Sequence, residues 1–359
     1  MLTSLGRGTL AGAVALYAAG FALGYPEPVV LATGALLAVA AALAWSAPAP
    51  RLEVRREVTP LKVPRGDAAV AVLTVTNLGR RGLSGLRAQD RIGASRHTVD
   101  LPRLPRNAVR TVSYPLPTDA RGEIPVGPLV LVRADPFGLT RRVRRYGATA
   151  TLLVRPRTVP LPVPPSGKAH HLEGPTSDNA PSGTVTFHTL REYVVGDDLR
   201  HIHWRSSART GTLMVRQLID ASLPTTTVVL DTRSLTEPAV DAAASVALAA
   251  ARAGFPVRLL TGEGPLTDAK ADAETVLDRL AVVRAGSAGV AEAVRLARGG
   301  GSLVLVTGDP AAAGGATAAR RRFDRVIVVH VGAAAVPAPG ITTLTIASLD
   351  DLARAWGSR

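Results

Sequence analysis

The chain begins with two long runs that contain no charged side chain, residues 8–26 and 28–50. Each run is close to the ~20 residues that a helix needs to cross the hydrocarbon core of a bilayer. Glu27 lies between Pro26 and Pro28 and marks a tight connection. The pattern predicts a transmembrane helical hairpin over residues 1–50. The alternatives are a buried hairpin of a soluble protein and a cleaved signal peptide, and the second apolar run argues against the signal peptide.

From residue 51 to residue 157 the pattern changes to short β-rich runs separated by turn residues. Residues 69–76 form one such run, which ends at Asn77-Leu78-Gly79. Further strands are predicted over residues 109–116, 129–132 and 151–154. Several short strands with frequent turn signals are typical of a small sandwich. We therefore expect an immunoglobulin-like β-sandwich over residues 51–157.

The next segment is rich in proline, with seven prolines in residues 156–183. Proline removes a backbone donor and is excluded from helix interiors and central strands. Residues 158–182 are therefore predicted to be a Pro/Gly-rich linker.

Strand and helix patterns alternate in the last part of the chain, which we assign to residues 183–359. Strands are predicted over residues 226–230, 257–260, 303–306, 326–329 and 341–345, and helices over 238–253, 271–280, 289–297 and 349–356. Such alternation with short connections predicts an α/β domain with a mainly parallel sheet flanked by helices. The chain is thus expected to be a multi-domain protein.

The positive charge is concentrated next to the predicted hairpin. Of the formal net charge of +14, residues 51–157 carry +13, from 20 Arg and one Lys against eight acids. Basic residues flank the hairpin on both outer sides (Arg7, then Arg51, Arg55 and Arg56), and the connection between the runs has none. The positive-inside rule then places both termini in the cytoplasm of a multi-pass cell-membrane protein. The basic domain would face the anionic lipid bilayer.

Composition and motifs also bear on nucleic-acid binding and on cofactor sites. Nucleic-acid binding through the basic β domain is an alternative, but the segment shows no aromatic stacking motif, zinc-finger spacing or basic helix, so no nucleic acid is expected. No phosphate loop, Gly-x-Gly-x-x-Gly run or Gly-x-Ser-x-Gly elbow is present, so no cofactor is predicted. Cysteine is absent, which excludes disulfides and thiolate metal sites.

Residues 191–211 combine ionisable and aromatic side chains in the densest run of the chain. Gly196 is predicted to form a turn, and Asp197 or Asp198 to cap a following helix with Leu199 and Ile202 on one face. Three acids and four guanidiniums within nineteen residues predict one ion-pair network, with Trp204 partly buried beside it. Its charged members are Arg191, Glu192, Asp197, Asp198, Arg200, Arg205 and Arg209.

The run Arg-Glu-Tyr-x-x-Gly-Asp-Asp-x-Arg-x-Ile-x-Trp-Arg-x-Ser-Ala-Arg resembles the signature of the bacterial domain-of-unknown-function family number 58. The resemblance is close over residues 183–217. The residues that carry it are Arg191, Glu192, Tyr193, Gly196, Asp197, Asp198, Arg200, His203, Trp204, Arg205 and Arg209. It implies a membrane-anchored protein with a von Willebrand factor A-like domain that works with a MoxR-type AAA+ ATPase. It assigns no catalytic residue.

A second run, Asp135-Pro136-Phe137-Gly138-Leu139, also resembles a hallmark of this family. From its residues alone we predict a turn with a buried Phe137.

The resemblance also bears on a metal site at the end of the first strand of the α/β domain. There, von Willebrand A domains open an Asp-x-Ser-x-Ser motif that holds a divalent cation, but Arg233 and Leu235 stand in place of the two serines that follow Asp231. A guanidinium would repel the ion, so no metal is predicted, although Asp231, Ser234 and Asp309 remain degenerate candidate ligands. Arg233 is expected to pair with Asp231 or Asp309 instead.

These observations favour a non-enzymatic, membrane-tethered interaction or adaptor protein whose α/β domain binds a cytoplasmic partner. The alternative from another class is a metal-dependent hydrolase or transferase with Asp197, Asp198 and His203 as acid and base groups. The oligomeric state stays open.

Overall fold

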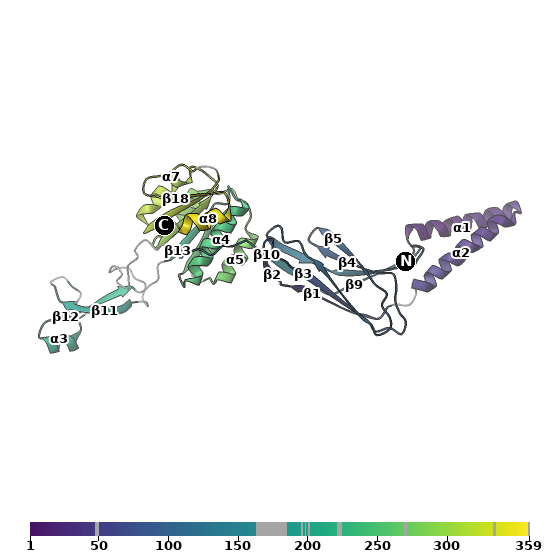
Figure 1. Ribbon diagram of the computed structural model, residues 1–359, viewed down its shortest axis with the longest axis horizontal. Coiled ribbons are helices and arrows are strands. Elements are labelled where there is room, and N and C mark those ends of the chain that lie inside the picture. The colour runs from purple at the N-terminus through teal and green to yellow at the C-terminus, as the bar shows by residue number, and fades with distance from the viewer. Residues whose placement is uncertain are drawn as a thin grey trace. The chain divides into compact units, whose positions relative to one another are not determined.

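The computed structural model describes residues 1–46, 50–162, 185–194, 197, 199, 202–220, 225–268, 271–332 and 335–357. The chain divides into two compact units, Met1–Arg155 and Pro156–Arg359 (Figure 1).

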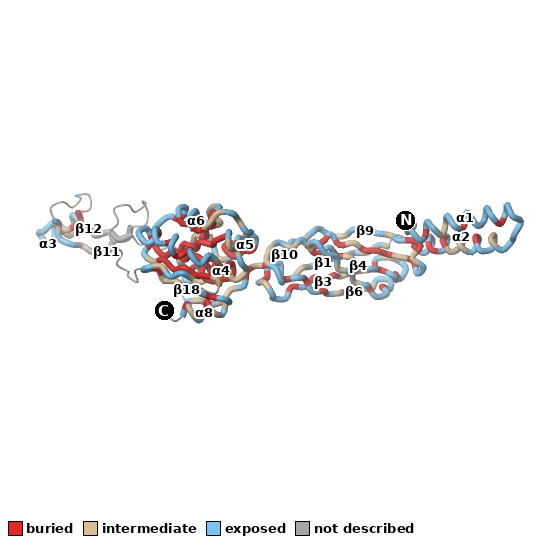
Figure 2. The backbone as a smooth tube through the Cα atoms, turned by 90° about the horizontal axis from the view of Figure 1, so that it is seen from above, coloured by how far each residue is buried: buried red, intermediate tan, exposed pale blue. Residues whose placement is uncertain are grey.

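The first unit opens with two antiparallel helices, α1 (Ser4–Leu23) and α2 (Pro26–Ser46). Thr3 caps α1, and Gly24, in the left-handed region at φ 74°, ends it. The buried residues of the two helices are small or medium-sized, and most other positions of the hairpin are exposed (Figure 2). Phe21 is 84% exposed and Val30 is 69% exposed. Of the described helices, α2 is long and apolar enough to cross a membrane.

Two β-sheets follow in the same unit. One joins β1 (Leu52–Thr59), β3 (Val70–Asn77) and β6 (Val109–Pro115). The other has the order β2-β10-β7-β4-β8-β9, with β5 paired to β4. Its strands are β2 (Lys62–Pro64), β4 (Leu86–Ile92), β5 (Ser95–Leu101), β7 (Gly122–Val126), β8 (Leu129–Ala134), β9 (Arg141–Tyr146) and β10 (Ala150–Arg155). Alternate apolar residues of both sheets form one core, so the prediction of a β-rich domain here is confirmed.

A buried polar cluster links the two sheets. Arg56 on β1 donates to the Asp90 carboxylate on β4 at 3.1 Å, and the Tyr114 hydroxyl on β6 donates to the same carboxylate at 2.5 Å. The Arg56 and Asp90 side chains are 6% and 2% exposed. Burial first, and then the hydrogen bond to Asp90, raise the pKa of Tyr114 well above its usual value.

The turn between β8 and β9 holds the base of the helical hairpin. Asp135 accepts hydrogen bonds from Phe137 N and Thr140 N, while the Thr3 hydroxyl donates to Gly138 O at 2.7 Å. Leu139 packs against Val39 and Ala42 of α2. The predicted turn is present, but the prediction that Phe137 is buried is wrong. Phe137 is 70% exposed, because Leu139 instead fills the contact with the hairpin.

The second unit contains a six-stranded sheet of order β15-β14-β13-β16-β17-β18. Its strands are β13 (Thr226–Leu230), β14 (Val257–Thr261), β15 (Gly264–Thr267), β16 (Ser302–Thr307), β17 (Arg325–Val331) and β18 (Thr342–Ile346). All neighbouring pairs are parallel except the edge pair β14–β15, which was not predicted. The mainly parallel sheet is therefore confirmed.

Helices cover both faces of this sheet, because alternate residues of each strand point to opposite sides. One face packs against α4 (Glu237–Arg252), α5 (Ala273–Val282) and α8 (Leu349–Gly357). The other packs against α6 (Val290–Leu296), α7 (Ala312–Ala316) and the 3₁₀ helix η2 (Thr317–Arg321). The four predicted helices correspond to α4, α5, α6 and α8, with ends that differ by one or two residues.

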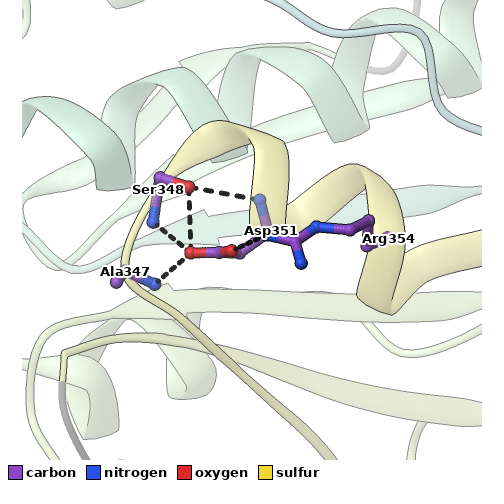
Figure 3. A network of polar contacts seen from close by, with 4 residues as sticks. All are labelled: Ala347, Ser348, Asp351 and Arg354. Carbon is purple, nitrogen blue, oxygen red and sulfur yellow. Dashed lines mark hydrogen bonds and ion pairs between the residues drawn. The ribbon is translucent and has the colours of Figure 1, made fainter.

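Two local contacts complete this unit. Ser348 and Asp351 cap the start of α8, where the Asp351 carboxylate accepts from Ser348 N at 2.9 Å and pairs with Arg354 at 2.5 Å (Figure 3).

The first residues of the predicted linker pack on the side of the sheet that α4 and α8 cover. Val159 N donates to Ser245 Oγ on α4, and the buried Trp356 donates to Pro162 O. Residues 163–182 lie outside the described residues.

Candidate functional site

The carboxyl end of the parallel sheet gathers a set of oxygen-bearing side chains. Asp231 directly follows β13, is 3% exposed, and accepts hydrogen bonds from Ser234 Oγ at 2.6 Å and Thr307 Oγ1 at 2.7 Å. Gly308 N donates to Ser234 Oγ, and Asp309 N donates to Thr307 Oγ1. Both hydroxyls are thus oriented toward one carboxylate. Strand ends of this kind are where open parallel sheets bind ligands.

A second carboxylate lies at the same edge, after β14. Glu263 accepts from Thr232 Oγ1 at 2.7 Å and from Ala288 N at 3.1 Å. The Thr232 hydrogen bond is the main reason that the pKa of Glu263 lies below its usual value. Glu263 borders an open pocket of about 520 Å³ that Arg279 and Arg284 also line. Glu263 follows the end of β14 much as Asp231 follows the end of β13, so its place at a strand end is the sequence signal that could have found it.

Arg233 does not act as predicted. Its Nε donates to Ser287 O at 3.1 Å, and only its backbone N contacts Asp231. The prediction that its side chain pairs with Asp231 or Asp309 is therefore wrong, because the loop before α6 supplies a carbonyl acceptor. The Asp231 carboxylate is satisfied by hydroxyls instead. Within the described ranges, no three His, Asp or Glu residues are grouped so that they could hold one metal ion.

His330 is a further residue of this edge that sequence reasoning missed. It lies on β17 in register with Thr307 and is 3% exposed. In the described part of the chain, neither of its ring nitrogens has a hydrogen-bond partner. A continuous apolar run interrupted by this single His is the sequence signal that could have found it.

The signature stretch forms an arm of two antiparallel strands, β11 (Val185–Glu192) and β12 (Met214–Asp220), which carries the short helix α3 (Trp204–Thr210). Arg191 and Asp197 form a two-pronged ion pair, with N–O distances of 2.8 and 2.6 Å. This contact lowers the pKa of Asp197, and the backbone N of Val194 contributes a further hydrogen bond. Two members of the predicted network therefore lie together.

The helix begins later than predicted. His203, rather than Asp197 or Asp198, caps α3, and its Nδ1 lies 2.7 Å from Ser206 Oγ. Ile202 is buried and bridges to Val215, while Leu199 is exposed, so the two do not share a helix face. His203 N donates to Met214 O at the start of β12, so α3 begins where the chain again contacts the β11–β12 arm. Asp197 and His203 both take part in local structural contacts.

The remaining members of the network are dispersed. Glu192, Arg205 and Arg209 are exposed, and among the described residues no ion pair joins their side chains. Tyr193 N donates to Leu213 O. Trp204 is 66% exposed, so its expected partial burial is wrong. Gly196, Asp198 and Arg200 lie outside the described residues, and the full seven-residue network stays a prediction.

Residues 189–331 match the model of a family described as "Protein of unknown function DUF58". This segment is a DUF58 region. The match confirms the resemblance drawn from the signature stretch. The DUF58 region begins within β11 and extends through β17, so it contains the arm from residue 189 onward and the carboxyl-edge cluster.

A comparison with curated proteins finds no match. Among solved structures, the chain is similar to the CARDB domain of the PF1109 protein from Pyrococcus furiosus, solved with di-metal ions. The two are 18% identical, the TM-score is 0.22, and the match covers 29% of this chain and 93% of that one.

Two further solved structures match at similar levels. The C-terminal domain of wzt is 13% identical with a TM-score of 0.23, over 30% of this chain and 78% of that one. The sporulation control protein Spo0M from Bacillus subtilis is 12% identical with a TM-score of 0.18, over 29% and 49%.

The DUF58 region thus offers two distinct surfaces. The carboxyl edge holds Asp231 and Glu263, and each carboxylate is oriented by hydroxyl or backbone donors. The arm presents Trp204 and Leu199 to solvent. The first surface is polar, whereas the second combines exposed apolar and basic side chains.

Proposed function

We propose that this protein is a membrane-tethered interaction protein that works in the cytoplasm with a MoxR-type AAA+ ATPase. In this proposal the β domain is immunoglobulin-like, the α/β domain is von Willebrand A-like, and the arm is the partner-binding element.

The exposed tip of the arm carries the proposal. Val194 and Leu199 are each 62% exposed and Trp204 is 66% exposed, beside Arg205 and Arg209 on α3. Exposed clusters of large apolar side chains mark interaction sites. Trp and Arg are also the residue types most enriched in the energetic centres of protein interfaces. A two-stranded arm that ends in such exposed residues fits partner binding better than catalysis.

The helical hairpin of α1 and α2 supports the proposed membrane tether. The buried residues of α1 are small, Gly6, Ala13 and Gly20, and Gly20 lies directly against Val29 of α2, while larger apolar residues of both helices are exposed. This is the reverse of a soluble helix pair and matches helix packing in lipid, where small residues let backbones approach. The basic flanks favour two spans with both termini in the cytoplasm. The partner is nominated by the family resemblance.

Affinity capture with the full chain in detergent tests the partner. We expect wild type to enrich an AAA+ ATPase from solubilised membranes of its own cell, and Trp204→Ala to lose most of it. Phe137→Ala, which removes a similarly exposed aromatic from the β domain, is the matched control. Equal capture by Trp204→Ala and wild type contradicts a role for the arm. Failure of wild type to enrich any such ATPase contradicts the partner.

The orientation has its own test. Alkaline phosphatase and a cytoplasm-active reporter are fused separately to the C-terminus. The cytoplasmic reporter should be active and the phosphatase silent. The opposite result reverses the orientation.

A further inference from the structure

An open pocket of about 710 Å³ lies where the end of α2 meets the β domain. One wall is the last turns of α2, with Ala41, Ala44 and Trp45. On the β-domain side, three arginines line the pocket, Arg81, Arg103 and Arg133, and no carboxylate is among its described lining residues. The pocket therefore combines an apolar side with a strongly positive side.

The loops that carry two of these arginines are held in place by a buried side chain. Asn77 is 0% exposed, and its Nδ2 donates to Arg81 O at 2.9 Å and to Leu104 O at 3.1 Å. Leu83 and Leu104 exchange two backbone hydrogen bonds of 2.8 Å across the same loops. Arg81 and Arg103 thus extend from a fixed backbone, which lowers the entropic cost of binding a ligand.

The third arginine lies deeper. Arg133 is 8% exposed, and burial first, and then the charge of Arg142, lower its pKa. Arg142 itself donates to Ser46 O at 3.0 Å, the last residue of α2. Two positive side chains are thus held close together at the end of the helix.

The chemistry of the two walls specifies the ligand. Guanidinium groups match the geometry of phosphate oxygens and bind them in pairs. Trp45 is 46% exposed at the helix end, and Trp is enriched at the level of lipid headgroups. A molecule with a phosphate on one side and hydrocarbon on the other satisfies both walls.

We propose that this pocket binds the phosphate headgroup of an anionic phospholipid, with Trp45 against the glycerol and upper acyl region. The inference rests on the proposed membrane tether. It assigns to Arg81, Arg103 and Arg133 a specific lipid site, beyond a general attraction of the basic domain to the bilayer.

Native mass spectrometry of the full chain released from detergent tests the site. The probes are phosphatidylglycerol, phosphatidylcholine and inorganic phosphate. Wild type should retain one phosphatidylglycerol in preference to phosphatidylcholine. Arg81→Gln/Arg103→Gln should weaken that binding about tenfold or more, since each basic residue near an anionic surface contributes ~1 kcal/mol. Both positions are exposed loop residues, so the fold should tolerate the change.

The matched control removes two charges from the other end of the same domain. Arg91 and Arg96 are paired across β4 and β5, at the end opposite Leu86 and Leu101. Arg91→Gln/Arg96→Gln should bind lipid like wild type. Equal losses in both double variants overturn the site in favour of general charge attraction. Equal binding of inorganic phosphate and phosphatidylglycerol overturns the lipid as the source of the phosphate group.

A carbonate wash of membranes separates this inference from the proposed tether. Wild type and both double variants should stay in the membrane pellet. If all stay but the lipid preference is absent from wild type, the tether holds and the lipid site is wrong. If wild type itself is washed off, the tether is wrong, and the lipid site falls with it.

Discussion

The Thr307 hydroxyl donates a hydrogen bond of 2.7 Å to the Asp231 carboxylate and so joins the ends of two neighbouring parallel strands, β16 and β13. Asp231 is nearly inaccessible to water, and Thr307 is fully buried. This contact holds the carboxyl edge of the sheet in one arrangement.

Thr307→Val keeps the shape of the side chain but removes this donor. We expect the free energy of unfolding to fall by about 1–3 kcal/mol, the cost of leaving a buried polar group without a partner. Urea unfolding of the α/β domain in the purified chain measures the change. Thr345→Val on the exposed side of β18 is the control and should change stability little. An equal effect of both substitutions would contradict the role of the hydroxyl.

The α/β domain is expected to be stable without a metal. Ser234 and Thr307 already satisfy Asp231, and Arg233 and Leu235 occupy the positions where oxygen ligands would be needed. Native mass spectrometry and thermal unfolding, with Mg²⁺ and then with a chelator, should give the same mass and the same Tm. The prediction is wrong if wild type binds one stoichiometric ion, and if Asp231→Ala loses that ion and has a much lower Tm.

The Arg191–Asp197 pair should order the arm locally without stabilising the domain. The Arg191 side chain is 43% exposed, and exposed ion pairs contribute little to stability. Asp197→Asn should leave Tm unchanged but speed hydrogen exchange at Val194 N, which donates to Asp197. Because the pKa of Asp197 is lowered, protection should be complete above the ordinary carboxyl pKa and be lost as the pH falls through the lowered pKa of Asp197.

Thr212→Ala, at an exposed position of the same arm, controls for general loosening and should leave that exchange rate unchanged. A large fall in Tm for Asp197→Asn would instead support a buried form of the ion-pair network predicted from the sequence.

The buried cluster of the β domain predicts a loss of stability at high pH. The pKa of Tyr114 is raised in the folded protein, so its contribution is complete below the unfolded value of about 10. Above that pH the unfolded chain releases a proton that the folded chain retains. The free energy of unfolding should then fall by about 1.4 kcal/mol per pH unit. Tyr114→Phe should remove this part of the slope. Tyr17→Phe, in the hairpin, should keep it.

Asp90→Asn tests the same cluster at neutral pH. It leaves the buried Arg56 without its carboxylate and should cost about 3–5 kcal/mol. Asp100→Asn, whose side chain is 76% exposed in its pair with Arg87, should cost far less. A similar small cost at both positions would show that the Arg56–Asp90 pair is not buried in solution.

The sequence by itself determined the order and type of most elements. Residues 226–230 were predicted as a strand with the ends that β13 has, and the last helix was placed within one residue of α8. Hydrophobic periodicity is a local property, so each helix or strand can be predicted from its own residues without knowledge of the rest of the chain. The Arg191–Asp197 pair was likewise predictable, since the two residues are six apart and oppositely charged. The DUF58 signature was recognisable for the same reason, because it is one continuous run.

Only the tertiary structure decided which distant residues meet. Arg56 and Asp90 are 34 residues apart, Asp231 and Thr307 are 76 apart, and Thr3 and Gly138 are 135 apart. Which strands become neighbours depends on packing of the whole core, and local pattern does not contain that information. The sequence therefore predicted a guanidinium partner for Asp231, whereas the adjacent strand supplied a hydroxyl. The arginines that line a pocket together with Trp45 are a further case, because they come from loops of the β domain and Trp45 comes from α2.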